Sequence, residues 1–332
     1  MTGARALLVA GALALAAGAV AARQAPPPAA GPPAATRLFL RPLTSFWQHL
    51  EEGSFEGPRG VYVDRANREV WVADSGNHRV GIFTPDGLPL YAAQPGGGVR
   101  EPTRLVVDRE GRVLVLDADR SRIAVLDWRG RYRGRLELPG LPERPVIGAL
   151  ALDERGQLYV GENSAGEVLV YAPDLRLRFR FGARGDGDGE FLAIADIEPA
   201  ADRILVVDHL ARPVQVFDRQ GNFLFGFGAH QLGAENFSLP EAVAVDSKGR
   251  MVVVDALRHE IKVFAPDGRF LDRFGGAGYA PGQVAGPCDI AIDGEDRIFV
   301  AERSGGRVQV FGEVEVPVPP SQRRRPARRV RE

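Results

Sequence analysis

Short apolar runs, each ending at an acidic or turn-forming residue, follow one another along most of the chain. In the stretch 57–87 two runs of β-branched and aromatic residues end at Asp64 and Asp74. A third run, a Pro-Asp-Gly turn and a fourth run from Leu88 come next. Residues of these types favour strands, and the turn formers between them separate one strand from the next. The pattern predicts a four-stranded antiparallel meander.

The same order of runs returns five more times at a nearly constant spacing. The acid that ends the second run recurs at intervals of 43 to 47 residues, at Asp74, Asp117, Glu162, Asp208, Asp255 and Glu302. The third run of every unit is apolar at its first, third and fourth places. A period of ~40–50 residues with four strands per unit is typical of propellers. We therefore predict an all-β fold, a six-bladed β-propeller of four-stranded antiparallel blades.

The sixth unit lacks a fourth strand of its own. After Phe311 the chain continues with Gly312 and a proline-rich tail that has no Pro-Asp-Gly turn. The segment 36–43 reads as a strand without a repeat around it. We therefore expect residues 37–41 to supply the outer strand of the last blade and to close the ring, which leaves no long unpaired sheet edge. The propeller is expected to span residues 36–315.

The turn between the second and third runs carries a family resemblance. Asn77 and His78 stand there in the first unit, with Arg79 in the place of a leucine, and the chain resembles the NHL-repeat family, which is named for an Asn-His-Leu triplet at this point. The fifth unit keeps only the histidine, His259. Prolines before the first runs and two glycine-rich linkers are also similar to the family, namely Pro58, Pro102, Pro240, Pro287 and the segments 185–191 and 280–284. The resemblance implies the fold more than an activity, with binding sites on the face where these turns gather.

The first 35 residues differ in composition from the repeats. Residues 1–22 hold one positive charge, Arg5, followed by an apolar and small run from Ala6, which is typical of a signal peptide. An uncleaved N-terminal anchor is the alternative, although a run of 17 residues is shorter than the ~20 that span a bilayer. We expect an exported protein of the periplasm or cell envelope, attached to a membrane through residues 6–22 only if that segment is uncleaved. Residues 23–35 form a Pro/Ala-rich linker.

The C-terminal segment 316–332 carries six arginines and one acid and is expected to be disordered. The formal net charge of the whole chain is only −1, and the six turns between second and third strands hold seven arginines against nine acids. Neutralising a phosphate backbone needs an excess of positive charge, so we expect no nucleic-acid partner. Cys288 is the only cysteine, which excludes a disulfide framework, and we expect it to be a buried, inert thiol.

The repeated acids and the histidines are the first candidates for chemistry. The six second-strand acids repeat identically, whereas a catalytic site needs residues with different roles, so we expect each carboxylate to bind backbone N–H groups of its own turn. Some six-bladed relatives are zinc-dependent lyases built on histidines. His78 and His259 match in position, but His209 lies out of register, and zinc needs three or four converging ligands. We therefore expect the loop histidines to hold their turns.

Calcium is the other metal that the fold suggests, because lactonases of the same shape bind calcium at the ring axis. Counting four residues back from each first-strand acid gives a mouth-lining set of Gly60, Arg104, Ala149, Ile194, Ala242 and Asp289. Of these only Asp289 could bind a cation, whereas calcium takes ~6–8 oxygens. The acids in 186–190 are read as part of an ordinary linker. We expect no metal, no cofactor and no catalytic residue.

The chain is therefore interpreted as a binding or scaffolding module that holds a protein or a small ligand on its loop face, and we expect a monomer. By position, the ligand-binding residues are expected to be Arg59, Asn77, His78, Arg104, Asn163, His259 and Asp289. A metal-dependent lactonase or lyase is the alternative.

Overall fold

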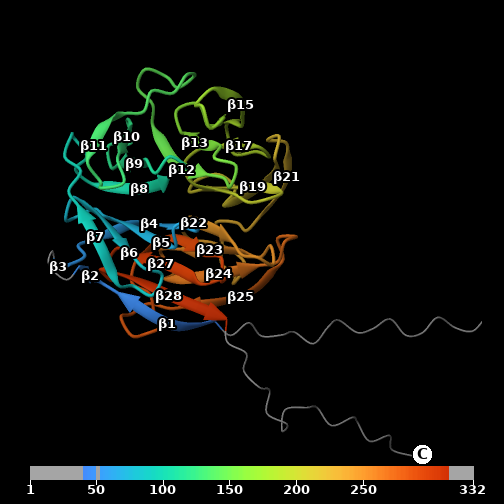
Figure 1. Cartoon of the computed structure of the whole chain (residues 1–332). Helices are drawn as coiled ribbons and strands as arrows, with labels where there is room; N and C mark the ends of the chain where they lie inside the picture. The colour runs from blue at the N-terminus through green and yellow to red at the C-terminus, as the bar shows by residue number, and fades with distance from the viewer. Residues whose placement is uncertain (1–39, 50–52, 314–332) are drawn as a thin grey trace, which may run out of the picture. The chain divides into compact units, whose positions relative to one another are not determined.

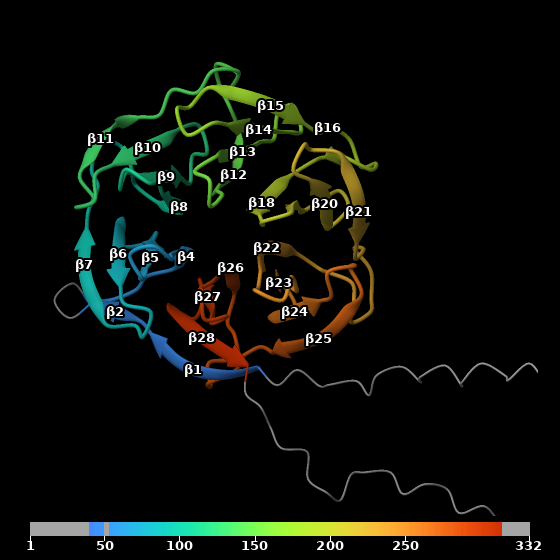
Figure 2. The same ribbon diagram turned by 45° about the vertical axis from the view of Figure 1, so that its right-hand side comes forward.

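The computed structural model describes residues 40–49 and 53–313, and every regular element among them is a β-strand. The strands form six four-stranded antiparallel sheets arranged as the blades of a ring (Figures 1 and 2). This architecture is the predicted six-bladed β-propeller. None of the described residues forms a helix that is long and apolar enough to cross a membrane.

Each blade is a simple meander that runs outward from the ring axis. Blade 1 consists of β4 (Pro58–Asp64), β5 (Glu69–Asp74), β6 (Arg79–Phe83) and β7 (Pro89–Ala93). Blade 2 consists of β8 (Pro102–Val107), β9 (Val113–Asp117), β10 (Ile123–Leu126) and β11 (Tyr132–Arg135). Blade 3 consists of β12 (Ile147–Leu152), β13 (Leu158–Glu162), β14 (Glu167–Tyr171) and β15 (Leu177–Phe181). Blades 4 and 5 consist of β18 (Ile194–Pro199), β19 (Arg203–Asp208), β20 (Val214–Asp218) and β21 (Phe223–Phe227); β22 (Pro240–Val245), β23 (Met251–Asp255), β24 (Glu260–Phe264) and β25 (Phe270–Gly275).

Blade 6 takes three strands from the end of the chain and one from its beginning. Its strands are β26 (Pro287–Ile292), β27 (Ile298–Glu302), β28 (Arg307–Glu313) and β1 (Leu40–Phe46). β1 pairs antiparallel with β28, from Leu40 opposite Glu313 to Phe46 opposite Val308. The ring closes as predicted, but the described closing strand is 40–46, so it extends past the expected 37–41 toward the C-terminus. This pairing joins the N-terminal strand to the last blade through backbone hydrogen bonds, and the chain continues from that strand into blade 1.

Four short strands lie between the blades. β2 (Gln48–His49) and β3 (Gly53–Ser54) form a small hairpin before blade 1, and β16 (Ala183–Arg184) pairs in parallel with β17 (Glu190–Phe191) before blade 4. The 185–191 linker belongs to this second pair. Within it the Glu190 carboxylate accepts the Gly187 N–H at 3.0 Å and Asp188 pairs with Arg212. These acids therefore serve the linker itself.

The core is divided into six clusters of buried apolar residues, and each cluster is shared by two neighbouring blades. This division explains how a ring of about 270 described residues avoids a single large core, because each sheet packs only on its neighbours. At the closing seam Phe46 lies 4.8 Å from Phe83 and 6.3 Å from Phe55 between ring centroids. The seam is thus packed with aromatic side chains as well as hydrogen bonded.

The third strands of blades 4, 5 and 6 carry a polar residue that fastens the loop entering the same blade. Gln215 binds the backbone of Gly189 and Glu190, and Gln309 binds the backbone of Gly282 and Gln283. Lys262 does the same to the carbonyl of Asn236. All three are almost completely buried, and their polar ends are satisfied by these bonds.

Several expectations concern residues outside the described ranges. These are the signal peptide or anchor at 1–22, the linker at 23–35, the first residues of the closing segment, 36–39, and the arginine-rich tail at 316–332.

Candidate functional site

The second-strand acids sit at the loop face of the ring and are built into the scaffold. Each of the six accepts at least one N–H from the loop that leads into its own blade, as with Glu56 to Asp74 and Ala285 to Glu302, both at 2.8 Å. Among the described residues, only Glu162 and Asp208 also accept backbone N–H groups of the turn that follows them. The predicted structural role holds, but the hydrogen-bond donors come mainly from the preceding loop instead of the carboxylate's own turn.

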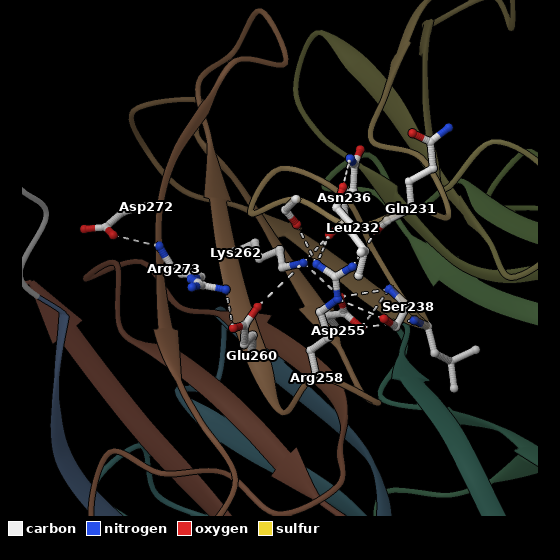
Figure 3. A network of polar contacts seen from close by, with 12 residues as sticks. Gln231, Leu232, Asn236, Ser238, Asp255, Arg258, Glu260, Lys262, Asp272 and Arg273 are labelled. Atoms are coloured by element: carbon white, nitrogen blue, oxygen red, sulfur yellow. Dashed lines mark hydrogen bonds and ion pairs between the residues drawn. The ribbon is translucent and has the colours of Figure 1, made fainter.

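In blade 5 the second-strand acid, Asp255, belongs to a larger network of polar contacts (Figure 3). Asp255 is fully buried and accepts N–H groups of Ser238 and Leu239, while Lys262 Nζ lies 2.9 Å from its Oδ2. Arg258 reaches over the same carboxylate at 3.6 Å and donates to loop carbonyls beyond it. The carboxylate and the ammonium are both removed from water and neutralise each other, so this network is structural.

His78 and His259 lie at equivalent turn positions and both have positive φ, 55° and 54°. The His78 ring binds the carbonyl of Arg100, and the His259 Nδ1 accepts the N–H of Gly286 at 3.1 Å. Both partners belong to the loop entering the next blade. Each histidine therefore connects neighbouring blades, and the two do not converge with His209, whose ring bonds to Glu241 at 3.2 Å.

The two asparagines of the expected site also serve the scaffold. Asn77 Nδ2 donates to the carbonyl of Ser54 and to Asp74, both at 2.8 Å. Asn163 grips the backbone of Ile194 from both sides, accepting its N–H at 2.7 Å and donating to its carbonyl at 3.2 Å. Their polar groups are occupied within the ring.

The axis of the ring carries a different set of polar residues. The register of the first and second strands places Gly60, Arg104, Ala149, Asp196, Ala242 and Asp289 at equivalent positions, each just after a β-bulge. The expected member from blade 4, Ile194, is wrong. The count along the sequence started from Glu198 and therefore missed Asp196. Glu198 is not equivalent to the acids that end the other first strands, because in blade 4 Ala200 holds that position. Blades 2, 4 and 6 thus carry charged side chains where blades 1, 3 and 5 carry glycine or alanine.

Arg104 reaches across the axis toward blades 1 and 6. Its Nη1 donates to the Arg59 carbonyl at 2.8 Å and lies 3.8 Å from Asp289 Oδ2, and its Nη2 donates to the Cys288 carbonyl at 3.4 Å. Its Nε is buried without a partner among the described residues. Burial would lower the pKa of Arg104, but the carboxylates of Asp289 and Asp196 outweigh it and raise that pKa. Arg104 therefore stays charged.

Asp196 and Asp289 accept the same kind of hydrogen bond. The Asp289 Oδ2 accepts the N–H of Val61 at 2.8 Å, and the Asp196 Oδ2 accepts that of Val243 at 2.9 Å. Burial raises the pKa of both carboxyls, that of Asp289 to about 7, with Arg104 opposing the shift in each case. Two residues after Asp196, in β18, burial and the charge of Asp196 raise the pKa of Glu198 to about 7.

The residues at the mouth around this axial set have mixed charge. Burial would raise the pKa of Glu241, but its hydrogen bond and ion pair with His209 hold that pKa below the usual value. A hollow of ≈ 200 Å³ opens on the loop face, with lining residues that include Arg59, His78, Glu101 and Arg303. Sequence reasoning named Arg59 and His78 and missed the other two, which have no special place in the repeat.

The axial donors do not fit a divalent cation. No group of three or more His, Cys, Asp or Glu side chains in the part of the chain that the structure describes is placed to hold a metal ion. Asp196 and Asp289 are bonded to backbone N–H groups, and the positive charge of Arg104 acts on both carboxylates. Calcium takes ~6–8 oxygen ligands and would be repelled by the guanidinium.

Solved structures of low sequence identity share this fold. They include virginiamycin B lyase from Staphylococcus aureus (14% identity, TM-score 0.56, covering 84% of this chain and 100% of that one). A gluconolactonase from Xanthomonas campestris (16%, 0.58, 78% and 87%) and an auxiliary nutrient binding protein from Bacteroides thetaiotaomicron (13%, 0.60, 83% and 76%) match similarly. At such identities the likeness shows the fold alone. No curated protein matches the sequence significantly.

Fold and site together define a six-bladed β-propeller whose axis is occupied by its own charged side chains. The NHL repeat model matches residues 55–83, which hold the first three strands of blade 1. Together with the six equivalent blades, this match supports the predicted resemblance to NHL-repeat β-propellers.

Proposed function

We propose that the protein is an exported binding module that recognises a protein or a small ligand on the loop face of its ring. Support comes from the hollow on that face, where Arg59 and Arg303 lie with Glu56 and Glu101 around one opening. Side chains of both signs provide hydrogen bonds and charge pairs for a polar partner, which favours specific recognition.

One observation carries this proposal: the polar groups at the axis are already engaged by the ring. Asp196 and Asp289 hold strands of the following blades, and Arg104 holds carbonyls of blades 1 and 6. A partner is therefore expected to bind over the mouth, at side chains such as Glu101 and Arg303 that are exposed there.

A lactonase or lyase remains the second candidate, because of one specific feature. Asp289 has its pKa raised to about 7 beside Arg104, and a carboxyl group of this kind can exchange a proton near neutral pH. A panel of sugar lactones and cyclic peptide esters, assayed with calcium or magnesium, tests it. Turnover that Asp289→Asn abolishes would establish the enzyme in place of the binding module.

Site-specific photocrosslinking in the source cells tests the binding module. A photoreactive residue replaces Glu101 or Arg303 on the loop face, and matched controls replace Glu110 or Arg68 on the opposite face, which are also exposed. Discrete adducts from the first pair alone are expected. Adducts of equal yield from both faces, or none from the loop face, would contradict the proposal.

Export is tested by the mass of the protein recovered from the same cells. The mature chain is expected in the periplasmic or envelope fraction with its N-terminus near residues 22–24, because the small residues that end the apolar run provide a cleavage site. A full-length chain in the cytoplasmic fraction would contradict export.

A further inference from the structure

We propose that one arc of the ring's outer rim, at blades 6, 1 and 2, rests on an anionic lipid bilayer. The rim arc is defined by exposed apolar residues that follow one another around the circumference: Leu43, Trp47, Leu88, Leu90, Tyr91 and Trp128. This surface is separate from the loop face, so the inference does not depend on the proposed binding function.

Contacts between the elements make the arc continuous. Phe46, at the end of β1, packs against the turn at Gly87. The approach is so close that a Cβ atom added to Gly87 would lie 2.7 Å from the Phe46 ring. β2 contacts β7, and the turn that carries Trp128 packs through Gly130 on Ala93, at the end of β7. The exposed side chains therefore belong to successive, touching segments of the rim.

The other outer strands do not expose two adjacent large apolar side chains. β21 and β25, in blades 4 and 5, expose one such residue each, Leu224 and Leu271. The exposed positions of the outer strands β11 and β15 are arginines, Arg133 and Arg135 in one and Arg178 and Arg180 in the other. The corresponding strand β7 exposes Leu90 and Tyr91 side by side at a bulge, 53% and 48% accessible. Contiguous exposed apolar side chains of this kind mark interaction surfaces.

The arc also contains both exposed tryptophans of the described chain, Trp47 and Trp128, which are 51% and 62% accessible. Trp and Tyr are enriched where proteins meet the headgroup region, because their rings are apolar and their N–H or O–H remains hydrated. The Arg129 guanidinium lies over the Trp128 ring at 4.4 Å and adds positive charge at that point.

The places where the chain enters and leaves the ring identify the occupant. Leu40 pairs with Glu313, so the N-terminal and C-terminal segments both join the ring at the end of the arc that carries Leu43. The C-terminal segment, which stays in the protein when residues 1–22 are cleaved, carries six arginines. Glu313, the acid at this junction, is neutralised by Lys248 and Arg250 at 2.6 and 3.0 Å.

These features complement one another on a negatively charged membrane. Stable attachment of a protein to a bilayer usually takes two signals, such as an inserted apolar chain and a basic cluster, and each arginine near an anionic surface adds to binding. The exposed apolar side chains of the arc and a basic tail that leaves the ring at its end would together bring this rim arc against the lipid. The loop face would then point along the membrane.

Tryptophan fluorescence of the mature chain, residues 24–332, tests the docking, with vesicles of phosphatidylcholine and phosphatidylglycerol compared with phosphatidylcholine alone. The third tryptophan, Trp71, is only 3% accessible and stays in the core, so changes report Trp47 and Trp128. We expect a blue shift on the anionic vesicles and quenching by brominated lipids. Vesicle binding with unshifted, unquenched emission, or no binding, would overturn the proposal.

A matched pair of variants separates the arc from the terminal segments. Leu43→Ser/Leu90→Ser/Tyr91→Ser keeps both reporters and should lose most of the blue shift and quenching. Leu224→Ser/Leu271→Ser, on the outer strands of blades 4 and 5, should keep them. Equal quenching in the two variants would overturn the docking surface. A dimer of the wild-type protein in the absence of lipid, seen by sedimentation and lost only in the triple variant, would also overturn the docking surface, because a second copy would then cover the arc.

Discussion

Asp196 and Asp289 occupy the same position in blades 4 and 6, and each carboxylate accepts an N–H from the first strand of the following blade. The two bonds, at 2.9 and 2.8 Å, connect neighbouring blades at the axis, where Arg104 from blade 2 compensates their charge. Three charged residues from alternate blades thus occupy the axial positions, and the two carboxylates among them are engaged instead of offering the free oxygens that a calcium ion takes.

The first prediction concerns the pH dependence of stability. An unfolded aspartate titrates near ~3.9, whereas burial raises the pKa of Asp289 in the folded protein to about 7. Between these values the folded state holds a proton that the unfolded chain releases, so stability falls as the pH rises from about 4 to about 7. Asp289→Asn cannot ionise and still offers an oxygen to Val61. Its melting temperature should fall less than that of the wild type between about pH 5 and 8.

Two controls accompany this titration. Asp186→Asn, at an exposed linker acid, should follow the wild-type curve. Arg104→Met removes the positive charge that opposes the shift, so the loss of stability toward neutral pH should be steeper. Parallel curves for all four proteins would show that the axial carboxyls do not titrate in this range.

The fold was predictable because the repeat supplies six copies of one strand pattern. The axial site could not be predicted, because it depends on the positions at which the six copies differ from one another. Blade 4 has Ala200 where the other blades end their first strand with an acid, so a count along the sequence selected Ile194, and only the strand register identifies Asp196. In the same way Glu241 and His209 become partners through the ring, 32 residues apart, with no shared motif.

The second prediction concerns ring closure. Phe46 is 6% accessible and packs against Phe55 and Phe83 across the seam, so Phe46→Ala should lower the free energy of unfolding by roughly 3–5 kcal/mol. Leu43→Ala, at an exposed position of the same strand, should change it by less than about 0.5 kcal/mol. Deletion of residues 36–43, which removes the pairing of Leu40 with Glu313, should lower the melting temperature sharply. Similar denaturation midpoints for both point variants would contradict a closing role for this strand.

The third prediction uses the single cysteine as a reporter. Burial raises the pKa of Cys288 to about 12, and its thiol donates to the carbonyls of Pro58 and Ala301 at 3.3 and 3.4 Å. Because the thiolate is the reactive form, a disulfide reagent should label the native protein only through unfolding and should label the denatured chain at once. Rapid stoichiometric labelling under native conditions would show that this inner strand opens locally.

The fourth prediction concerns the buried ion pair of blade 5, in which Lys262 and Asp255 are both inaccessible to solvent. Asp255→Asn removes the nearest counter-charge of the buried ammonium, leaving the Glu260 carboxylate at 3.7 Å, and should cost roughly 3–5 kcal/mol of unfolding free energy. Lys262→Met should cost less, because Asp255 keeps the N–H groups of Ser238 and Leu239. The loss of unfolding free energy in the double variant should be smaller than the sum of the two single-variant losses by about 0.5–3 kcal/mol, since the double variant removes both members of the ion pair. Additive effects in chemical denaturation would show that the two side chains contribute independently, and the loop entering blade 5 would then be held by Asp255 alone.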